Sequence, residues 1–116
     1  MKKRVVHFEI GCSDVEKTSA FYEKVFNWNL SLQGNYASID MGDENALKGH
    51  MNQLGPNDPQ NYVTLYIETD SLIADLKAIV ANGGQIFVNP KTLPDGRVFA
   101  WFKDITGNLM GLITPN

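Results

Sequence analysis

The sequence predicts an α+β fold in which two βαβββ modules form an eight-stranded, cupped and incompletely closed sheet with the helices outside. Three observations lead to this prediction. An alternating strand is followed by an amphipathic helix, the same pair returns after a polar linker, and three short strand patterns follow each helix. Neither module covers both faces of its own sheet, so pairing the modules leaves a concave interior open to ligands.

The first module begins with an alternating strand over Arg4–Ile10. Successive residues of a strand point to opposite faces, so His7 and Glu9 share one face, about 7 Å apart at their Cα atoms. The other face is apolar and is expected beneath the first helix. Its residues are Val6, Phe8 and Ile10.

Apolar residues at helical spacing predict an amphipathic helix over Val15–Phe26, with Asp14 as its N-cap and Asn27 at a left-handed end. Gly and Asn turns then separate three short strands. These strands are expected at about Leu30–Gln33, Tyr36–Met41 and Ala46–Leu54.

A linker at residues 55–60 contains two prolines and no strongly apolar residue, and the pattern restarts after it. Ser71 is the expected N-cap of the second helix, and Asn82-Gly83-Gly84 is expected to close that helix. The apolar residues that precede Ser71 have the same spacing as those before Asp14; they are Val63, Leu65 and Ile67. Three more strands are expected at Gln85–Val88, Arg97–Lys103 and Asn108–Thr114. We expect one domain over 1–116, with modules at about 4–54 and 61–116.

Composition narrows the range of functions. A chain of 116 residues with a net charge of −3 and a pI near 5.2 does not have the basic balance of a nucleic-acid-binding protein. The run Lys2-Lys3-Arg4 is interpreted as a solvated terminus. We expect no signal peptide and no membrane span, because no apolar stretch is long enough. Cys12 is the single cysteine, which fits a reducing cytoplasm.

Several motifs along nearly the whole chain carry a family resemblance. They are His7-Phe8-Glu9-Ile10, Asp14, Phe21–Trp28, Tyr66-Ile67-Glu68, Asn82-Gly83-Gly84, Phe102-Lys103-Asp104 and Gly107-Asn108. Their order and spacing resemble glyoxalase-like proteins of the vicinal-oxygen-chelate superfamily, which also contains bleomycin resistance proteins and extradiol dioxygenases. The resemblance implies the paired-module fold and a ligand site on its concave face.

In metal-dependent members, the resemblance implies four His, Gln or Glu ligands, one from the first and last strand of each module, around a divalent cation that acts as a Lewis acid. The positions assigned here are His7, Thr64, Gly111 and either Lys48 or Gly49. Only His7 is a good ligand, although His50 lies one or two residues from the fourth position. We therefore expect no metal and no other cofactor; the alternative is one Zn, Ni, Mn or Fe ion.

The candidate catalytic residues are His7, Glu9 and Glu68, since a histidine between carboxylates serves as a general base near neutral pH. The alternative is a polar network whose members only satisfy one another. Further candidates for contact with a ligand are Thr64, Tyr66, Phe99, Trp101 and His50. Phe99 and Trp101 share one face of their strand, and the sequence leaves open whether that face lines the cavity.

Three functions stay open. The first is a metal-free protein that binds a small apolar or conjugated molecule, as drug-sequestering relatives do. The second is a metal-dependent lyase, isomerase or dioxygenase related to lactoylglutathione lyase, and the third is a metal-free enzyme that uses His7 with Glu9 or Glu68. In each case the expected partner is a small molecule and neither a nucleic acid nor a membrane. Unpaired edge strands favour a homodimer.

Overall fold

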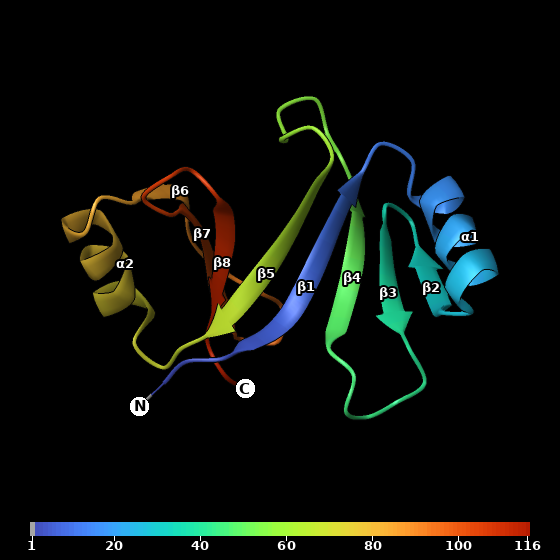
Figure 1. Cartoon of the computed structure of the whole chain (residues 1–116), viewed down its shortest axis with the longest axis horizontal. Coiled ribbons are helices and arrows are strands. Elements are labelled where there is room, and N and C mark those ends of the chain that lie inside the picture. Colours follow the sequence, from blue (N-terminus) through green and yellow to red (C-terminus); the bar gives the residue numbers. More distant parts are fainter. Residues whose placement is uncertain (1) are drawn as a thin grey trace. The chain divides into compact units, whose positions relative to one another are not determined.

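The computed structural model describes residues 2–116, and the order strand, helix, three strands occurs twice along them (Figure 1). The first repeat consists of β1 (Val5–Cys12), α1 (Val15–Phe26), β2 (Asn29–Gln33), β3 (Tyr36–Asp40) and β4 (Lys48–Gln53). The second consists of β5 (Tyr62–Glu68), α2 (Leu72–Ala81), β6 (Gln85–Thr92), β7 (Val98–Lys103) and β8 (Leu109–Ile113).

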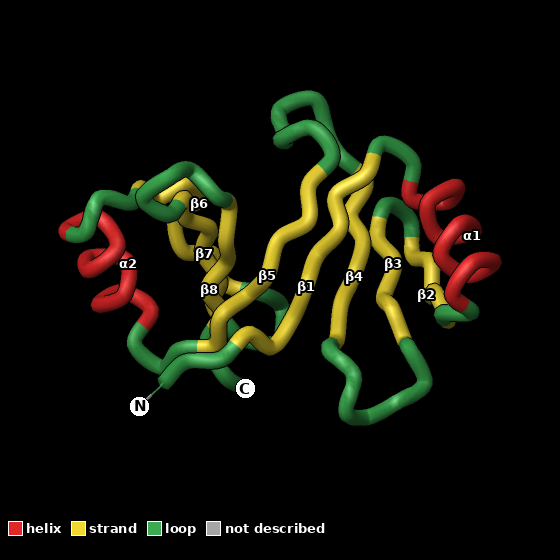
Figure 2. The backbone as a smooth tube through the Cα atoms, viewed as in Figure 1, coloured by secondary structure: helices red, strands yellow, loops and turns green. Residues whose placement is uncertain are grey.

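The two repeats have the same strand arrangement. The order is β2-β3-β4-β1 in the first and β6-β7-β8-β5 in the second. In each repeat the first and last strands are parallel neighbours and the remaining pairs are antiparallel. Figure 2 traces the backbone of these strands in yellow. The eight strands belong to one mixed sheet that is not closed, and this confirms the predicted α+β class with two βαβββ modules.

The chain forms two compact units that differ slightly from the predicted modules. One unit is His7–Val63. The other joins Thr64–Asn116 to the start of the chain as far as Val6. Within this second unit, the backbone N–H of Glu68 donates to the carbonyl of Arg4 at 2.9 Å, and Lys3 Nζ lies 2.7 Å from Asp75 Oδ1 on α2. The first residues of the chain are therefore held by the second repeat.

The predicted bounds of α1 are confirmed. Asp14 is the N-cap, and its side chain accepts a hydrogen bond from the backbone N–H of Lys17 at 3.0 Å. Asn27 ends the helix in the left-handed conformation, with φ of 61°, which asparagine adopts more readily than most residues. The helix packs on β2, β3 and β4.

Ser71 occupies the N-cap position of α2, as predicted, but its side chain makes no capping bond. Ser71 Oγ accepts a hydrogen bond from Lys3 Nζ at 2.8 Å, and the backbone N–H of Ser71 donates to Thr69 Oγ1 at 3.1 Å. At the other end, Gly83 has φ of 96°, the positive value for which the glycine pair was expected.

The predicted end of β6 at Val88 is too early, because the strand continues to Thr92. Pro90 cannot donate to a sheet hydrogen bond, so the sequence suggests a break there. β6 is the last strand in the sheet order, where an edge position tolerates proline. Its pairing with β7 shifts register twice before Lys91.

The core of the first unit lies under α1 and contains Phe8, as predicted. Its buried residues are Phe8, Cys12, Val15, Ala37, Ile39 and Met51. Ile10 is partly buried against this cluster, whereas Val6 is half-buried and belongs to the other unit.

The core of the second unit lies under α2 and orients β7. Its buried residues are Leu72, Leu76, Ala100, Phe102 and Leu112, with Ile67 partly buried against them. Because Ala100 and Phe102 face α2, the alternate residues Phe99 and Trp101 lie on the opposite face of the strand. β7 therefore turns Phe99 and Trp101 away from α2.

Two residues predicted beneath α2 are exposed, so that part of the prediction is wrong. Val63 is 66% exposed and Leu65 is 37% exposed, while Ile67 is packed as expected. The reason is that α2 packs on β6 and β7, and β5 pairs with β8 only from Tyr66 to Glu68. The first half of β5 therefore extends beyond the cover that the helix provides.

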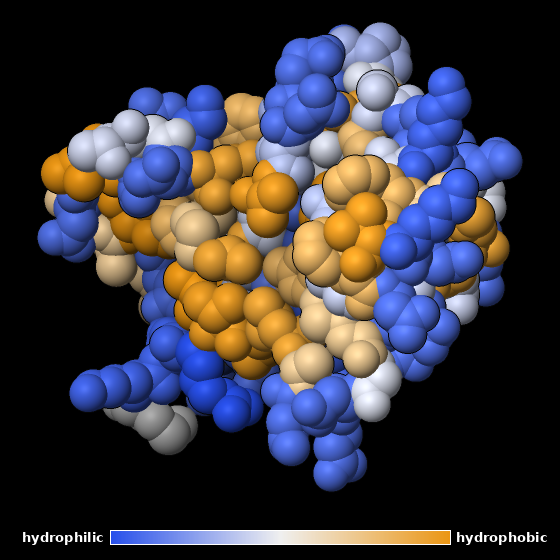
Figure 3. Space-filling view, turned by 45° about the vertical axis from the view of Figure 1, so that its right-hand side comes forward, coloured by the Kyte–Doolittle hydropathy of each residue, from blue (hydrophilic) through white to orange (hydrophobic). Residues whose placement is uncertain are grey.

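Apolar side chains also reach the surface elsewhere, as the orange regions of Figure 3 show. On α1 the exposed ones include Phe21, Val25 and Phe26. Within residues 2–116, neither helix is long and apolar enough to cross a membrane.

Truncation of the first-strand core residue is expected to be costly. Phe8 is 8% exposed, and Phe8→Ala should lower the free energy of unfolding by about 3–5 kcal/mol in urea denaturation. Leu65→Ala is the matched control, because Leu65 has the equivalent place before the second helix but is exposed; its loss should be below about 1 kcal/mol. Equal losses at the two positions would contradict this packing.

Candidate functional site

The first unit places two histidines side by side. β1 and β4 are parallel neighbours in a register that sets Glu9 opposite His50. Since alternate residues share a face, His7 and Glu9 of β1 lie on the same side of the sheet as His50. His7 Nε2 and His50 Nδ1 are 2.6 Å apart, a hydrogen-bond distance.

Glu9 is buried at 2% exposure, and three polar groups surround its carboxylate. His50 Nε2 lies 3.2 Å from Oε1. At Oε2, the Tyr62 hydroxyl donates a short hydrogen bond and Asn52 Nδ2 donates another at 3.0 Å. A buried carboxylate keeps its charge only with such partners, so this arrangement supports an ionised Glu9.

The carboxylate of Glu9 assigns the protons of the histidine pair. An ionised carboxylate only accepts hydrogen bonds, so the ring nitrogen that faces it, His50 Nε2, is the protonated one. In a neutral His50 ring, Nδ1 is then the acceptor, and it receives the N–H of His7 Nε2. The result is a directed chain from His7 through His50 to Glu9, the arrangement by which a carboxylate fixes the tautomer of an imidazole.

A stacking contact also holds the ring of His50. Tyr36, at the start of β3, stacks on His50 with ring centroids 5.2 Å apart and an angle of 21° between the planes. Tyr36 remains 42% exposed. Stacking limits rotation of the imidazole, which complements its hydrogen bonds to His7 and Glu9.

The second unit gathers the predicted aromatic residues. Trp101 Nε1 donates a 2.7 Å hydrogen bond to the hydroxyl of Tyr66, and both residues are buried. Phe87 stacks beside Trp101 with ring centroids 6.3 Å apart. Phe99 is half-buried on the same face of β7. Thr64 is fully buried, and its hydroxyl is the one buried side-chain polar atom within residues 2–116 that lacks a hydrogen-bond partner.

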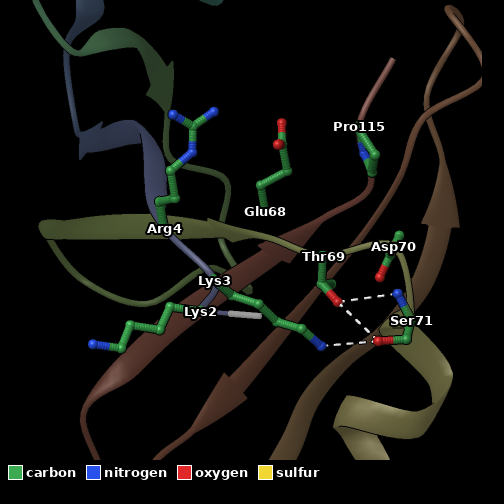
Figure 4. A pocket seen from close by; sticks show the side chains of 8 residues that line it. All are labelled: Lys2, Lys3, Arg4, Glu68, Thr69, Asp70, Ser71 and Pro115. Atoms are coloured by element: carbon green, nitrogen blue, oxygen red, sulfur yellow. Dashed lines mark hydrogen bonds between the residues drawn. The ribbon is translucent and has the colours of Figure 1, made fainter.

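Glu68, the remaining candidate acid, lines a pocket of about 680 Å³ at the start of the chain (Figure 4). The other lining residues are Lys2, Lys3, Arg4, Thr69, Asp70, Ser71 and Pro115. In this pocket the Lys3 amino group binds Ser71, and Thr69 binds Ser71 in turn (Figure 4). Glu68 thus lies among basic, acidic and hydroxyl side chains of its own unit.

The fourth ligand position of the resemblance differs from the one expected. Lys48 is exposed, and a Cβ on Gly49 would lie 2.4 Å from the ring of Phe8, so Gly49 faces the core under α1. His50 is the β4 residue that lies beside His7. In the strand registers, Glu9 lies opposite His50 as Tyr66 lies opposite Gly111, so His50, and not Lys48 or Gly49, is the β4 counterpart of Gly111.

Two residues that contact Glu9, Asn52 and Tyr62, were absent from the sequence-based candidates. Together with His7, Glu9 and His50 they form the cluster discussed below. A signal for Asn52 and for Tyr62 existed in strand parity. Asn52 lies two residues after His50, and Tyr62 two residues before Thr64, so each shares a face with a candidate. Neither residue type suggests a function by itself, and only the hydrogen bonds of the folded chain show that both reach Glu9.

Comparison with known proteins identifies the family to which this chain belongs. Residues 4–112 match the Glyoxalase/Bleomycin resistance protein/Dioxygenase superfamily. The chain belongs to this superfamily, and the sequence-based identification is confirmed.

Individual relatives are distant. A glyoxylase-like domain-containing protein of Didymella fabae is 25% identical, and the match covers 91% of this chain and 89% of that protein. A hypothetical protein from Bacillus halodurans C-125 has a TM-score of 0.73 at 15% identity, covering 100% of this chain and 96% of that one. Streptomyces coelicolor methylmalonyl-CoA epimerase in complex with 2-nitronate-propionyl-CoA has a TM-score of 0.65 at 17% identity, covering 98% of each chain. The two structural likenesses show the shared fold.

The residues present do not fit the four-ligand metal centre that the resemblance implies. His7 Nε2 and His50 Nδ1 are suitable donors, but the Glu9 carboxylate lies at the opposite nitrogen of His50, so the three groups do not converge on one point. Within residues 2–116, no three His, Cys, Asp or Glu side chains group as metal ligands.

The two family positions of the second unit do not complete the set. Thr64 offers a neutral hydroxyl, which is not among the usual ligands of zinc or other transition metals. Gly111 offers no side chain, and a Cβ there would lie 2.5 Å from the ring of Tyr66. Tyr66 thus fills the space that a ligand side chain at residue 111 would need.

The Tyr62–Glu9 contact predicts a pH dependence of stability. Burial, and then the neighbouring Glu9 carboxylate, raises the pKa of Tyr62 far above its ordinary value of 10.0. Above pH 10 the unfolded chain therefore releases this proton while the folded chain keeps it, and stability falls as pH rises. In urea denaturation between pH 9 and 11, the wild type should lose up to about 1.4 kcal/mol per pH unit more than Tyr62→Phe. Parallel curves for the two proteins would show that Tyr62 titrates alike in both states.

Proposed function

We propose that this chain binds a small molecule without a catalytic metal, and that the His7–His50 pair, oriented by Glu9, accepts a proton from that molecule. The observation that carries the proposal is the directed contact from His7 Nε2 to His50 Nδ1 and from His50 Nε2 to Glu9. The ligand class that suits it is a weak acid, such as a phenol, an enolisable carbonyl compound or a carboxylic acid.

The charges of the cluster support this ligand class. Glu9 contributes one buried negative charge, and the two imidazoles are neutral in the arrangement described above. A proton from the ligand makes the histidine pair cationic, and that charge then lies between the buried carboxylate of Glu9 and the ligand anion. Both opposite charges favour the protonated pair. An acid ligand therefore supplies both the proton and the anion that stabilises the protonated pair, whereas a ligand without an acidic proton supplies neither.

The second unit, taken by itself, has an aromatic face that we propose contacts small molecules. Tyr66, Phe99 and Trp101 share the face of their strands that α2 leaves uncovered, and Thr64 adds a buried hydroxyl. Aromatic surfaces of this kind suit flat or conjugated ligands. A homodimer and a cytoplasmic location remain predictions from the sequence.

Acid–base catalysis without a metal is the second candidate, and the same directed contact favours it. Histidine titrates near neutral pH, and a carboxylate behind it stabilises the imidazolium that forms when it removes a proton. His50 lies between His7 and Glu9, so Glu9 acts through His50 and not as a direct partner of His7. Turnover of a bound ligand separates this candidate from binding alone.

Ligand-induced thermal shifts test the proposal with 4-nitrophenol, acetylacetone and benzoate as probes of the three acid classes. A probe that stabilises the wild type should bind at least about tenfold more weakly to His7→Ala, because the proton acceptor is lost. Gln33→Ala, an exposed change on β2, is the control and should bind like the wild type. Equal binding by His7→Ala, His50→Ala and the wild type would refute the role of the pair.

Metal analysis tests the other half of the proposal. Protein purified without chelator should contain less than about 0.1 equivalent of Zn, Ni, Mn or Fe, because His7 and His50 supply only two of the three or more ligands that a stable site needs. Near-stoichiometric metal that disappears in His7→Ala would instead establish the metal-dependent alternative.

A further inference from the structure

We propose that Tyr62, which lies over Gly11, is a positioning residue that holds Glu9 against His50 and thereby fixes the tautomer of the histidine pair. The inference rests on the proposed function, since the tautomer matters only if the pair accepts a proton from a ligand. It adds a residue that neither the sequence motifs nor the family positions indicate.

Two groups compete for the Nε2 atom of His50. Glu9 Oε1 and Asn52 Nδ2 are both 3.2 Å from it. If Glu9 is the partner, Nε2 carries the proton and Nδ1 accepts from His7. If the amide N–H of Asn52 is the partner, Nε2 is the acceptor and Nδ1 carries the proton. The second state reverses the direction of the hydrogen bond between the histidines.

The Tyr62 hydroxyl favours the first state. It donates to Glu9 Oε2, and Asn52 Nδ2 donates to the same oxygen at 3.0 Å. With Oε2 held by both groups, Oε1 is directed at His50 and the amide of Asn52 is engaged with the carboxylate. Without the hydroxyl, the carboxylate loses one of the partners that fix its orientation. Burial keeps the phenol of Tyr62 protonated, so the donor persists over the whole neutral range.

The absence of a side chain at Gly11 leaves room for the ring of Tyr62. A Cβ built on Gly11 would lie 2.2–2.6 Å from three atoms of the Tyr62 ring, closer than any real contact. Gly11 is not among the glycines with positive φ, so space and not backbone conformation requires it. It lies opposite Asn52 in the β1–β4 register, which brings the ring beside the Asn52–Glu9 contact. A side chain at residue 11 would displace Tyr62 from Glu9 without altering any atom of the cluster itself.

The chain has two histidines, so nitrogen NMR of histidine-labelled, ligand-free protein resolves each ring. The wild type should show His50 protonated at Nε2 and not at Nδ1. In Tyr62→Phe, the ratio of the two His50 tautomers should fall by roughly two- to tenfold, the equivalent of one lost hydrogen bond. Gly11→Ala should reproduce this change although Tyr62 is intact. Tyr22→Phe is the matched control, a tyrosine of α1 outside the cluster, and should leave the spectrum unchanged.

An unchanged His50 spectrum in folded Tyr62→Phe overturns the inference. That variant removes a single oxygen atom, and its circular dichroism spectrum verifies the fold independently of Gly11→Ala. Because no ligand is present, the result stands apart from the ligand experiment. Loss of the tautomer preference together with equal ligand binding by His7→Ala would uphold the positioning role and refute the proposed function. The reverse pair of results would do the opposite.

Discussion

A carboxylate removed from water must be met by hydrogen-bond donors or lose its charge, and Glu9 presents that requirement in the middle of the first strand. The polar residues around Glu9 meet this requirement. Asn52 and Tyr62 satisfy one oxygen, and His50 satisfies the other. Because the carboxylate occupies one nitrogen of His50, the other is left for His7, and the chemistry proposed for the histidine pair starts from this buried charge.

The two repeats use one backbone plan for different purposes. Glu9 pairs with His50 between the parallel strands of the first repeat, and Tyr66 pairs with Gly111 at the corresponding place in the second. In the first repeat this pair is ionisable, whereas in the second a tyrosine ring fills the space above a glycine. The buried histidine–carboxylate contact therefore lies in the first unit, and the corresponding place in the second unit has an aromatic surface next to Trp101.

Local patterns in the sequence predicted most of the fold because local physics decides it. The bounds of α1 follow from Asp14 and Asn27, whose capping geometry depends on a few neighbouring residues. Strand parity likewise predicted that His7 and Glu9 share a face. The exposure of Val63 was not predictable in this way, since it depends on which strands α2 covers.

The candidate site was predicted less completely, for a related reason. His7 and Glu9 were found on one strand, but their partners come from β4 and β5, and register between strands is a long-range property. A shift of two residues separates Lys48, which is exposed, from His50, which is at the centre of the cluster. Asn52 belongs to no sequence motif, and only the register that sets it opposite Gly11 brings its amide to Glu9.

The attachment of the chain start to the second unit has a consequence for dividing the protein. A cut in the linker at residues 55–60 would appear to release two equal repeats. It would instead leave the second repeat without Lys3 and Arg4, which bind Asp75 and the backbone of Glu68. The chain therefore crosses the boundary between the two units twice, after Val6 and after Val63. A rearranged chain that begins near Thr64, continues through Asn116 and rejoins the original start ahead of His7 would keep each unit's own residues contiguous.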